Sequence, residues 1–241
     1  MSELKYIIGC SGFILPKERY FSVFRAVEVT EFYLSLIKES TAKKWLERTR
    51  KDAIFCLVAP KWIVETPTER ERSTILRGDY KNYGEFKLTD ANLDLYERLY
   101  KVARVLNSPT ILFITPASWG PDRRNKEKMY KFFTTVPRED VEIVWEPRGI
   151  WTKAELERIS KDLNISISFD PVREVPKVFR SPYYARITPL SSFSRQLTII
   201  QWESLMENLA SIKEGTVYIF FGNQGALNDA KRLIQRLNLE G

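Results

Sequence analysis

Short, continuously apolar runs recur along the whole chain and constrain its fold more than any other feature. Most of them lack the alternation of polar and apolar residues expected of a half-exposed strand, and this is typical of parallel strands buried on both faces. We predict eight strands, at Tyr6–Cys10, Val27–Thr30, Ile54–Ala59, Thr110–Thr115, Val141–Glu146, Ile165–Phe169, Tyr183–Ile187 and Thr216–Phe221.

Helical patterns separate many of these runs. Asp90–Leu106 places apolar residues three and four positions apart, which predicts a helix with one apolar face. Thr152 and Glu155 have the spacing of a capping box, in which a hydroxyl and a carboxylate satisfy first-turn amides, and they predict a helix that runs to Leu163. Further helices are expected at Thr41–Arg50, Lys126–Thr134, Trp202–Ile212 and Leu227–Leu237.

Strands that alternate with helices over 241 residues predict an α/β fold, a single TIM-like (β/α)8 barrel, with residues 1–241 as one domain. Two connections differ from the rest. Pro60–Thr89 is long and charged, and Pro171–Pro182 contains three prolines without a helical stripe. We therefore expect the barrel to be irregular around strand three and between strands six and seven.

The chain has no histidine and two cysteines, and these counts exclude several kinds of active site. Ser-His-Asp and Cys-His catalysis and His-ligated zinc all need a histidine, and a tetrahedral thiolate zinc site within one chain needs more than two cysteines. The remaining catalytic groups are carboxylates, Lys, Arg, Tyr, Ser, a thiolate or an oxygen-ligated metal. Mg²⁺ or Mn²⁺ is compatible with oxygen ligands, but no motif requires either ion. The cofactor stays open, and no metal ligands are assigned.

A net charge of +7 favours an anionic partner, either a small molecule or a nucleic acid. The 31 acidic residues interleaved with 38 basic ones support a second interpretation, a solvated and salt-bridged surface. No run of about 20 apolar residues predicts a membrane span, and the N-terminus lacks the apolar core of a signal peptide. We expect a cytoplasmic protein without a membrane partner, and the sequence does not fix its oligomeric state.

Polar residues gather where the predicted strands end, and in a parallel barrel these ends form the functional face. Glu146 and Asp170 are the candidate catalytic residues, as acid and base or as cation ligands. Candidate substrate-binding residues at the strand ends are Ser11, Glu28, Thr30, Arg148, Arg186 and Asn223. The guanidinium groups of Arg148 and Arg186 are suited to hold an anion bidentately. The alternative is a structural ion-pair network that closes this end of the barrel.

Several short sequence words lie at the same strand ends. They are I-G-C-S-G-F at residues 8–13, V-E-V-T-E-F-Y at 27–33, I-L-F-I-T-P at 111–116, E-P-R-G-I-W at 146–151, Asp170, and Y-I-F-F-G-N at 218–223 followed by Asn228 and Ala230. In this order they resemble the domain-of-unknown-function 72 family, the YecE-like proteins, almost from end to end. The resemblance implies a TIM-barrel-like fold. A nuclease-like or phosphate-binding role is implied only through the likeness of that family to other TIM barrels.

The chain resembles a divergent member of that family, because three of the family's polar positions differ. Val58 stands where the family has a lysine, Thr188 where it has a histidine, and Thr30 where it has an asparagine. If these groups take part in chemistry elsewhere in the family, this chain is altered or inactive.

Three hypotheses follow for the function. The first is an enzyme, for example a hydrolase, that binds a phosphate- or sugar-containing substrate at the C-terminal mouth of the barrel. The second is a non-catalytic module that binds nucleic acid or a metabolite and has lost the family's Lys and His. The third is a scaffold that uses the long Pro60–Thr89 connection. We favour the anion-binding barrel mouth that the first two share, and the substrate and the reaction stay open.

Overall fold

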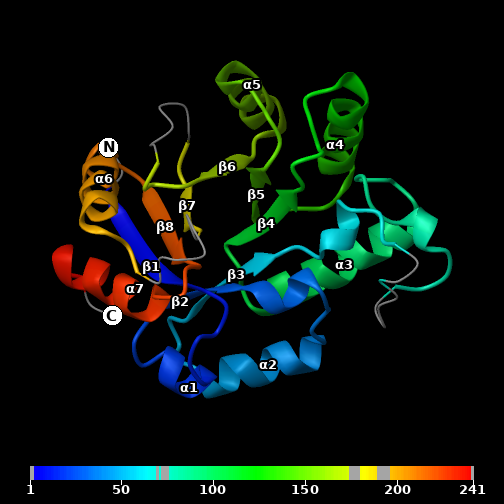
Figure 1. Ribbon diagram of the computed structural model, residues 1–241. Coiled ribbons are helices and arrows are strands. Elements are labelled where there is room, and N and C mark those ends of the chain that lie inside the picture. Colours follow the sequence, from blue (N-terminus) through cyan, green and yellow to red (C-terminus); the bar gives the residue numbers. More distant parts are fainter. Residues whose placement is uncertain (1–2, 69–70, 72–75, 174–179, 189–195, 240–241) are drawn as a thin grey trace. The chain divides into compact units, whose positions relative to one another are not determined.

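The computed structural model describes residues 3–68, 71, 76–173, 180–188 and 196–239. Its strands are all parallel and follow one another in sequence order around a closed barrel (Figure 1). They are β1 (Lys5–Ser11), β2 (Ala26–Val29), β3 (Ile54–Val58), β4 (Thr110–Thr115), β5 (Glu142–Pro147), β6 (Ser166–Phe169), β7 (Tyr183–Ile187) and β8 (Thr216–Phe221). The predicted fold class is therefore confirmed.

The predicted end of the second strand is wrong by one residue, and that residue is a candidate site residue. Thr30 was expected at the end of the second strand, but β2 ends at Val29 and Thr30 begins a 3-10 helix, η1 (Thr30–Tyr33). At the neighbouring strand, Gly9 is paired with Ala26, and a Cβ at Gly9 would lie 2.0 Å from the Ala26 carbonyl oxygen. Only glycine lets β1 approach β2 at this point.

Helices follow most of the strands, as the apolar stripes predict. They are α1 (Lys17–Tyr20), α2 (Glu39–Arg48), α3 (Asp90–Val105), α4 (Arg123–Thr135), α5 (Lys153–Leu163), α6 (Ile199–Ala210) and α7 (Ala226–Arg236). The capping box of Thr152 and Glu155 is present at the start of α5. None of the described helices is both long and apolar enough to span a lipid bilayer.

The irregular connections lie where the sequence places them. Between β3 and β4 the chain forms two 3-10 turns, η2 (Lys61–Ile63) and η3 (Tyr80–Asn82), before α3 begins. Between β6 and β7 no helix occurs among the described residues, and 174–179 of the proline-containing connection lie outside them.

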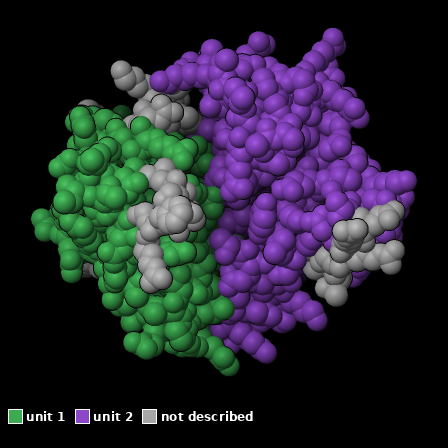
Figure 2. All heavy atoms as spheres, in the orientation of Figure 1, with its two compact units in different colours: residues 1–29, 48–55, 168–241 green, residues 30–47, 56–167 purple. Residues whose placement is uncertain are grey.

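Two compact units make up the chain (Figure 2). Unit 1 comprises residues 1–29, 48–55 and 168–241, and unit 2 comprises residues 30–47 and 56–167. The expectation of one domain over residues 1–241 stays a prediction.

In unit 1, β1 pairs with β2 and β8, β7 pairs with β8, and α7 packs on β1 and β8 (Figure 1). Cys10 is buried in this packing with Tyr20, whose hydroxyl accepts from the Cys10 amide at 2.8 Å and donates to the Ala26 carbonyl at 2.8 Å. Burial raises the pKa of the Cys10 thiol to about 12. Such a thiol stays protonated at neutral pH, as expected of a structural residue rather than a nucleophile.

In unit 2, aromatic rings from α3, α4 and β4 form a buried cluster. Phe86, which precedes α3, contacts Phe113, Phe132 and Phe133 with ring centroids 5.3 to 6.1 Å apart. These rings are at most 1% exposed. The cluster holds the connection after β3 against the helices that follow it, and so it fixes the backbone on which the candidate site of unit 2 is built.

Candidate functional site

Glu28 in β2 is the centre of the polar cluster in unit 1. Its Oε1 accepts hydrogen bonds from Arg186 Nε at 2.7 Å and from the Tyr184 hydroxyl at 3.0 Å. Its Oε2 accepts from Arg186 Nη2 at 2.8 Å and from Ser11 Oγ at 2.7 Å. The predicted residues Ser11, Glu28 and Arg186 are thus brought together at the ends of β1, β2 and β7, with Tyr184 as a partner that the sequence interpretation missed.

This Glu28 cluster is closed to solvent. Glu28 has no exposed surface, and 10% of the Arg186 side chain is exposed. Each carboxylate oxygen accepts two hydrogen bonds, so the charge is fully compensated within the protein. The bidentate contact also fixes the plane of the guanidinium. Glu28 therefore orients Arg186 and is itself occupied.

The other two predicted residues of unit 1 contact the loops that follow their own strands. Asn223, after β8, donates to Asp229 Oδ2 at 2.7 Å, and Asp229 also accepts from the Leu197 amide at 3.1 Å. Asp170, after β6, accepts from the Val172 amide at 3.0 Å and lies 3.7 Å from the exposed Arg173 guanidinium. Both side chains shape the loops that follow their strands.

Glu146 and Arg148 form the corresponding pair in unit 2, at the end of β5. Arg148 Nε donates to Glu146 Oε1 at 2.8 Å, and the side chains are 49% and 14% exposed. The predicted catalytic residues Glu146 and Asp170 belong to different units, so each is described within its own unit. Thr30, at the start of η1, is half-buried in unit 2.

Tyr33 and Glu65 form a second polar contact in unit 2. The Tyr33 hydroxyl at the end of η1 donates to Glu65 Oε1 at 3.1 Å. Burial, followed by the neighbouring Glu65 carboxylate, raises the pKa of Tyr33 to about 12, and the charges of Arg148 and Glu146 act on it as well. Tyr33 is therefore a neutral donor at physiological pH that lies within electrostatic reach of both acidic side chains.

A cavity of about 600 Å³ opens beyond the carboxyl ends of β3 and β4 in unit 2. We call it the β3–β4 cavity. Its charged and amide side chains are Glu65, Glu85, Asp122, Arg124, Asn125 and Lys128. Lys128 pairs with Glu85 and is the main reason that the pKa of Glu85 lies below its usual range. Asp122 caps α4 by accepting from the Asn125 amide at 2.9 Å.

The other cavities of the described residues do not lie at the predicted face. A cavity of about 520 Å³ in unit 1 is lined by Lys5, Tyr6 and Ile54, where β1 and β3 begin rather than end. A groove of about 810 Å³ in unit 2 is lined by side chains of α4 and α5 on the outside of the strands. In contrast to these two, the β3–β4 cavity follows the carboxyl ends of strands.

Sequence reasoning missed the residues that line this cavity. The signal for Glu65 and Glu85 was the length and charge of Pro60–Thr89, and the signal for Arg124 was the basic stretch before the fourth helix. Neither signal says which side chain faces a cavity, because no periodic pattern fixes a loop. Among the described residues, no group of three or more His, Cys, Asp or Glu side chains could hold a metal ion.

Closed parallel barrels with functional residues at the carboxyl ends of the strands define the class of TIM barrels, and this chain has that fold. A family model for the protein of unknown function DUF72 matches residues 17–241, and the chain belongs to this family. The predicted resemblance is thereby confirmed. A comparison with proteins of curated function finds no match.

Solved structures agree with this assignment. A DUF72 family protein from Enterococcus faecalis is 15% identical with a TM-score of 0.72, covering 100% of this chain and 99% of its own. A DUF72 family protein from Thermotoga maritima is 16% identical with a TM-score of 0.65, covering 97% and 99%. A D-tagatose 3-epimerase-like protein is 15% identical with a TM-score of 0.58, covering 98% and 96%. At these identities the likeness shows the fold alone.

Proposed function

We propose that this protein binds a small anionic, phosphate- or sugar-containing molecule at the carboxyl ends of its barrel strands, in the β3–β4 cavity of unit 2. The observation that carries the proposal is the cavity itself. It lies beyond β3 and β4 and is bounded by charged side chains that solvent can reach. Binding residues of TIM barrels come from the loops at this end of the strands, and ligand sites are concave with a few convergent polar groups.

Glu65 lines the cavity, and Arg148 lies outside its lining but close enough for its charge to act on Tyr33, the hydrogen-bond partner of Glu65. Together they offer the two kinds of contact that such a ligand needs. A carboxylate accepts hydrogen bonds from sugar hydroxyls, and Glu65 is held in place by Tyr33. Arg148 is about half exposed and could exchange part of its contact with Glu146 for a ligand oxygen. Glu146 is then the acid or base of a hydrolytic reaction, with Tyr33 as a neutral donor nearby.

The experiment is a calorimetric titration of the protein with inorganic phosphate, sugar phosphates and the unphosphorylated sugars. Loss of one charge-assisted hydrogen bond costs about 1.5–3 kcal/mol, so we expect Glu65→Gln and Arg148→Met to weaken binding by about ten- to a hundredfold. Glu47→Gln, at an exposed residue of α2, and Arg98→Met, at a half-buried residue of α3 that pairs with Asp94, serve as matched controls. The absence of binding by any of these compounds, or equal binding by all variants, would overturn the proposal.

A test of catalysis uses Glu146→Gln. If the bound molecule is hydrolysed, this variant should keep its affinity and its free energy of unfolding while turnover falls by about 10²–10⁴-fold, the usual contribution of one acid or base. Retention of turnover would leave a binding function without catalysis by Glu146.

A second candidate function is nucleic-acid binding, and helix α4 is the observation that favours it. The helix carries five basic residues, Arg123, Arg124, Lys126, Lys128 and Lys131, and one acidic residue, Glu127. If several phosphates are contacted, the affinity for DNA or RNA should fall steeply between about 50 and 200 mM salt. A protein that retains no DNA or RNA at low salt would rule this function out.

A further inference from the structure

We infer that the ligand of the β3–β4 cavity is a polyhydroxylated molecule with a single anionic end, held with that end on Arg124 and with its hydroxyl groups on Glu65. This inference rests on the proposed function and names its ligand class. It is drawn from the distribution of charge within the cavity.

Arg124 is the uncommitted cation of the cavity wall. It is exposed and lies in the first turn of α4, and no hydrogen bond or ion pair joins it to a residue that the structure describes, although its charge acts on Glu85 and helps to lower the pKa of that carboxyl. Lys128, one turn further on the same side, is already paired with Glu85. The first turn of α4 contains no acidic residue, but the N-cap residue Asp122 precedes it, and its carboxylate offsets part of the helix field beside Arg124.

Trp119 provides an independent observation of an unfilled position in the same cavity. This side chain lines the cavity and is 6% exposed, and its indole N–H has no hydrogen-bond partner in the part of the chain that the structure describes. Its backbone carbonyl is engaged, because it accepts from the Trp151 indole at 3.1 Å. Buried donors are nearly always satisfied, so this N–H marks an unfilled position in the wall. Because the nitrogen has almost no accessible surface, a ligand oxygen can accept from it only after a shift of the neighbouring side chains.

The acidic side chains of the cavity disfavour a ligand with more than one anionic group. Glu65, Glu85 and Asp122 outnumber the two cations of the wall, so a polyanion would meet repulsion there. One oxygen of Glu65 accepts from Tyr33, and the carboxylate has further lone pairs that can accept from ligand hydroxyls. A molecule with several hydroxyl groups and one terminal phosphate or carboxylate matches Glu65 with its hydroxyl groups and Arg124 with its anionic end.

The backbone around Glu85 is held rigidly, so the cavity is preformed. Gly84, Glu85 and Phe86 all have left-handed φ values of 81°, 54° and 53°. A Cβ at Gly84 would lie 2.4 Å from the Thr66 amide nitrogen. Strained residues of this kind persist where the surroundings fix them, and here the buried Phe86 ring does so. The Glu85–Lys128 pair therefore forms a fixed wall that leaves Arg124 and Glu65 to the ligand.

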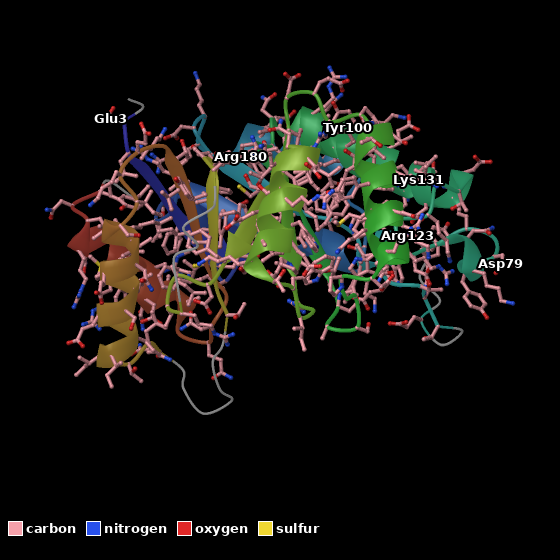
Figure 3. The ribbon with its side chains drawn as sticks, turned by 90° about the horizontal axis from the view of Figure 1, so that it is seen from above. Glu3, Asp79, Tyr100, Arg123, Lys131 and Arg180 are labelled. Atoms are coloured by element: carbon pink, nitrogen blue, oxygen red, sulfur yellow. The ribbon has the colours of Figure 1, made fainter. Side chains whose placement is uncertain are left out.

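The experiment is a calorimetric titration of the full chain with ribose 5-phosphate, glucose 6-phosphate, ribonate, ribose and glucose. We expect each anionic compound to bind about tenfold or more tightly than its parent sugar, because a charge-assisted contact is present only in the former. Arg124→Met should abolish this preference while the sugars bind as before. Arg123→Met is the matched control, since Arg123 is the neighbouring residue of α4, lines the outer groove and pairs with Glu127 (Figure 3). It should retain the preference.

The outcomes separate this inference from the proposed function. If the anionic compounds bind but Arg124→Met and Arg123→Met behave alike, the assignment of the anionic end is wrong and the proposed function stands. If nothing binds at all, both are wrong. Equal dependence of ribonate and ribose 5-phosphate on Arg124 supports a general site for one anionic group, and dependence of ribose 5-phosphate alone supports a phosphate site. Trp119→Phe should weaken the binding of the anionic compounds more than the binding of the sugars. An equal loss of affinity for both would contradict the position given to the anionic end.

Discussion

The two units place charged residues at the ends of their strands in opposite ways. In unit 1, Glu28 and Arg186 are buried, and each oxygen of Glu28 accepts two hydrogen bonds. In unit 2, Arg148 donates to Glu146 at a partly exposed position, and Glu65 lies at the edge of a cavity. Similar residue types at the ends of the strands therefore differ in how far solvent can reach them.

This difference separates a structural role from a binding role. A buried, saturated ion pair has little capacity left for a ligand, and removal of one partner leaves an uncompensated charge in the protein. A partly exposed carboxylate or guanidinium can exchange water for ligand at small cost to the fold. We therefore expect substitutions in the Glu28 cluster to change mainly the free energy of unfolding, and substitutions around the β3–β4 cavity to change mainly binding.

The largest effect is expected for Arg186→Met. This substitution leaves the Glu28 carboxylate buried without its cation, and the free energy of unfolding in urea should fall by about 3–5 kcal/mol. The double variant Glu28→Met/Arg186→Met removes both charges and should recover more than half of the loss. If the single variant unfolds within about 1 kcal/mol of the parent chain, the contrast between the two clusters is broken.

An effect of intermediate size is expected for two tyrosines, one in each unit, that each donate a hydrogen bond to a glutamate. Tyr184 donates to the buried Glu28 and Tyr33 donates to the more accessible Glu65, at 3.0 and 3.1 Å. Hydrogen bonds to charged groups are worth about 1.5–3 kcal/mol when no water can replace them. Urea unfolding of Tyr184→Phe should show a loss in that range, whereas Tyr33→Phe should lose about 0.5–1 kcal/mol. Equal losses would show that Glu65 is no more accessible to water than Glu28.

The fold could be predicted from the sequence because burial leaves a periodic record. Thr110–Thr115 and Tyr183–Ile187 match β4 and β7 residue for residue, since buried parallel strands are uninterrupted apolar runs. The capping box could also be predicted, because its two side chains, those of Thr152 and Glu155, have a fixed spacing in the chain. Each of these features is local, and each is set by residues that are close in the chain.

The candidate site could be predicted only in part. Glu28 and Arg186 were recognised as strand-end residues, but their mutual saturation depends on Tyr184 and Ser11, and no local pattern indicates which charges meet. Glu65 and Glu85 were hidden in a connection without periodicity. Their positions are set by the left-handed backbone at Gly84–Phe86 and by the distant rings around Phe86.

A smaller effect on stability is expected for Arg148→Met. The pair with Glu146 is partly exposed, so urea unfolding should change by less than about 1 kcal/mol. The same variant should bind the anionic compounds more weakly, as proposed above. A loss of stability comparable with that of Arg186→Met would place Arg148 in a structural network and remove it from the binding site.

The smallest effect is expected from the acid titration of Glu85. Lys128 holds the pKa of this carboxyl below its ordinary value of 4.5, so the folded state favours the charged form. A depressed pKa contributes stability that is present above the unfolded pKa and is lost as the pH falls below it. Glu85→Gln should therefore be less stable than the parent chain at pH 7, by no more than about 1 kcal/mol, and this difference in stability should disappear below pH 4.5.

The control is Glu157→Gln, at an exposed residue of α5. Urea unfolding at the same pH values should show no such pH-dependent difference in stability for this variant. The difference in free energy of unfolding between Glu85→Gln and the parent chain could instead stay constant as the pH falls below 4.5. The wall of the cavity would then be held by packing around Phe86 and not by the Glu85–Lys128 pair.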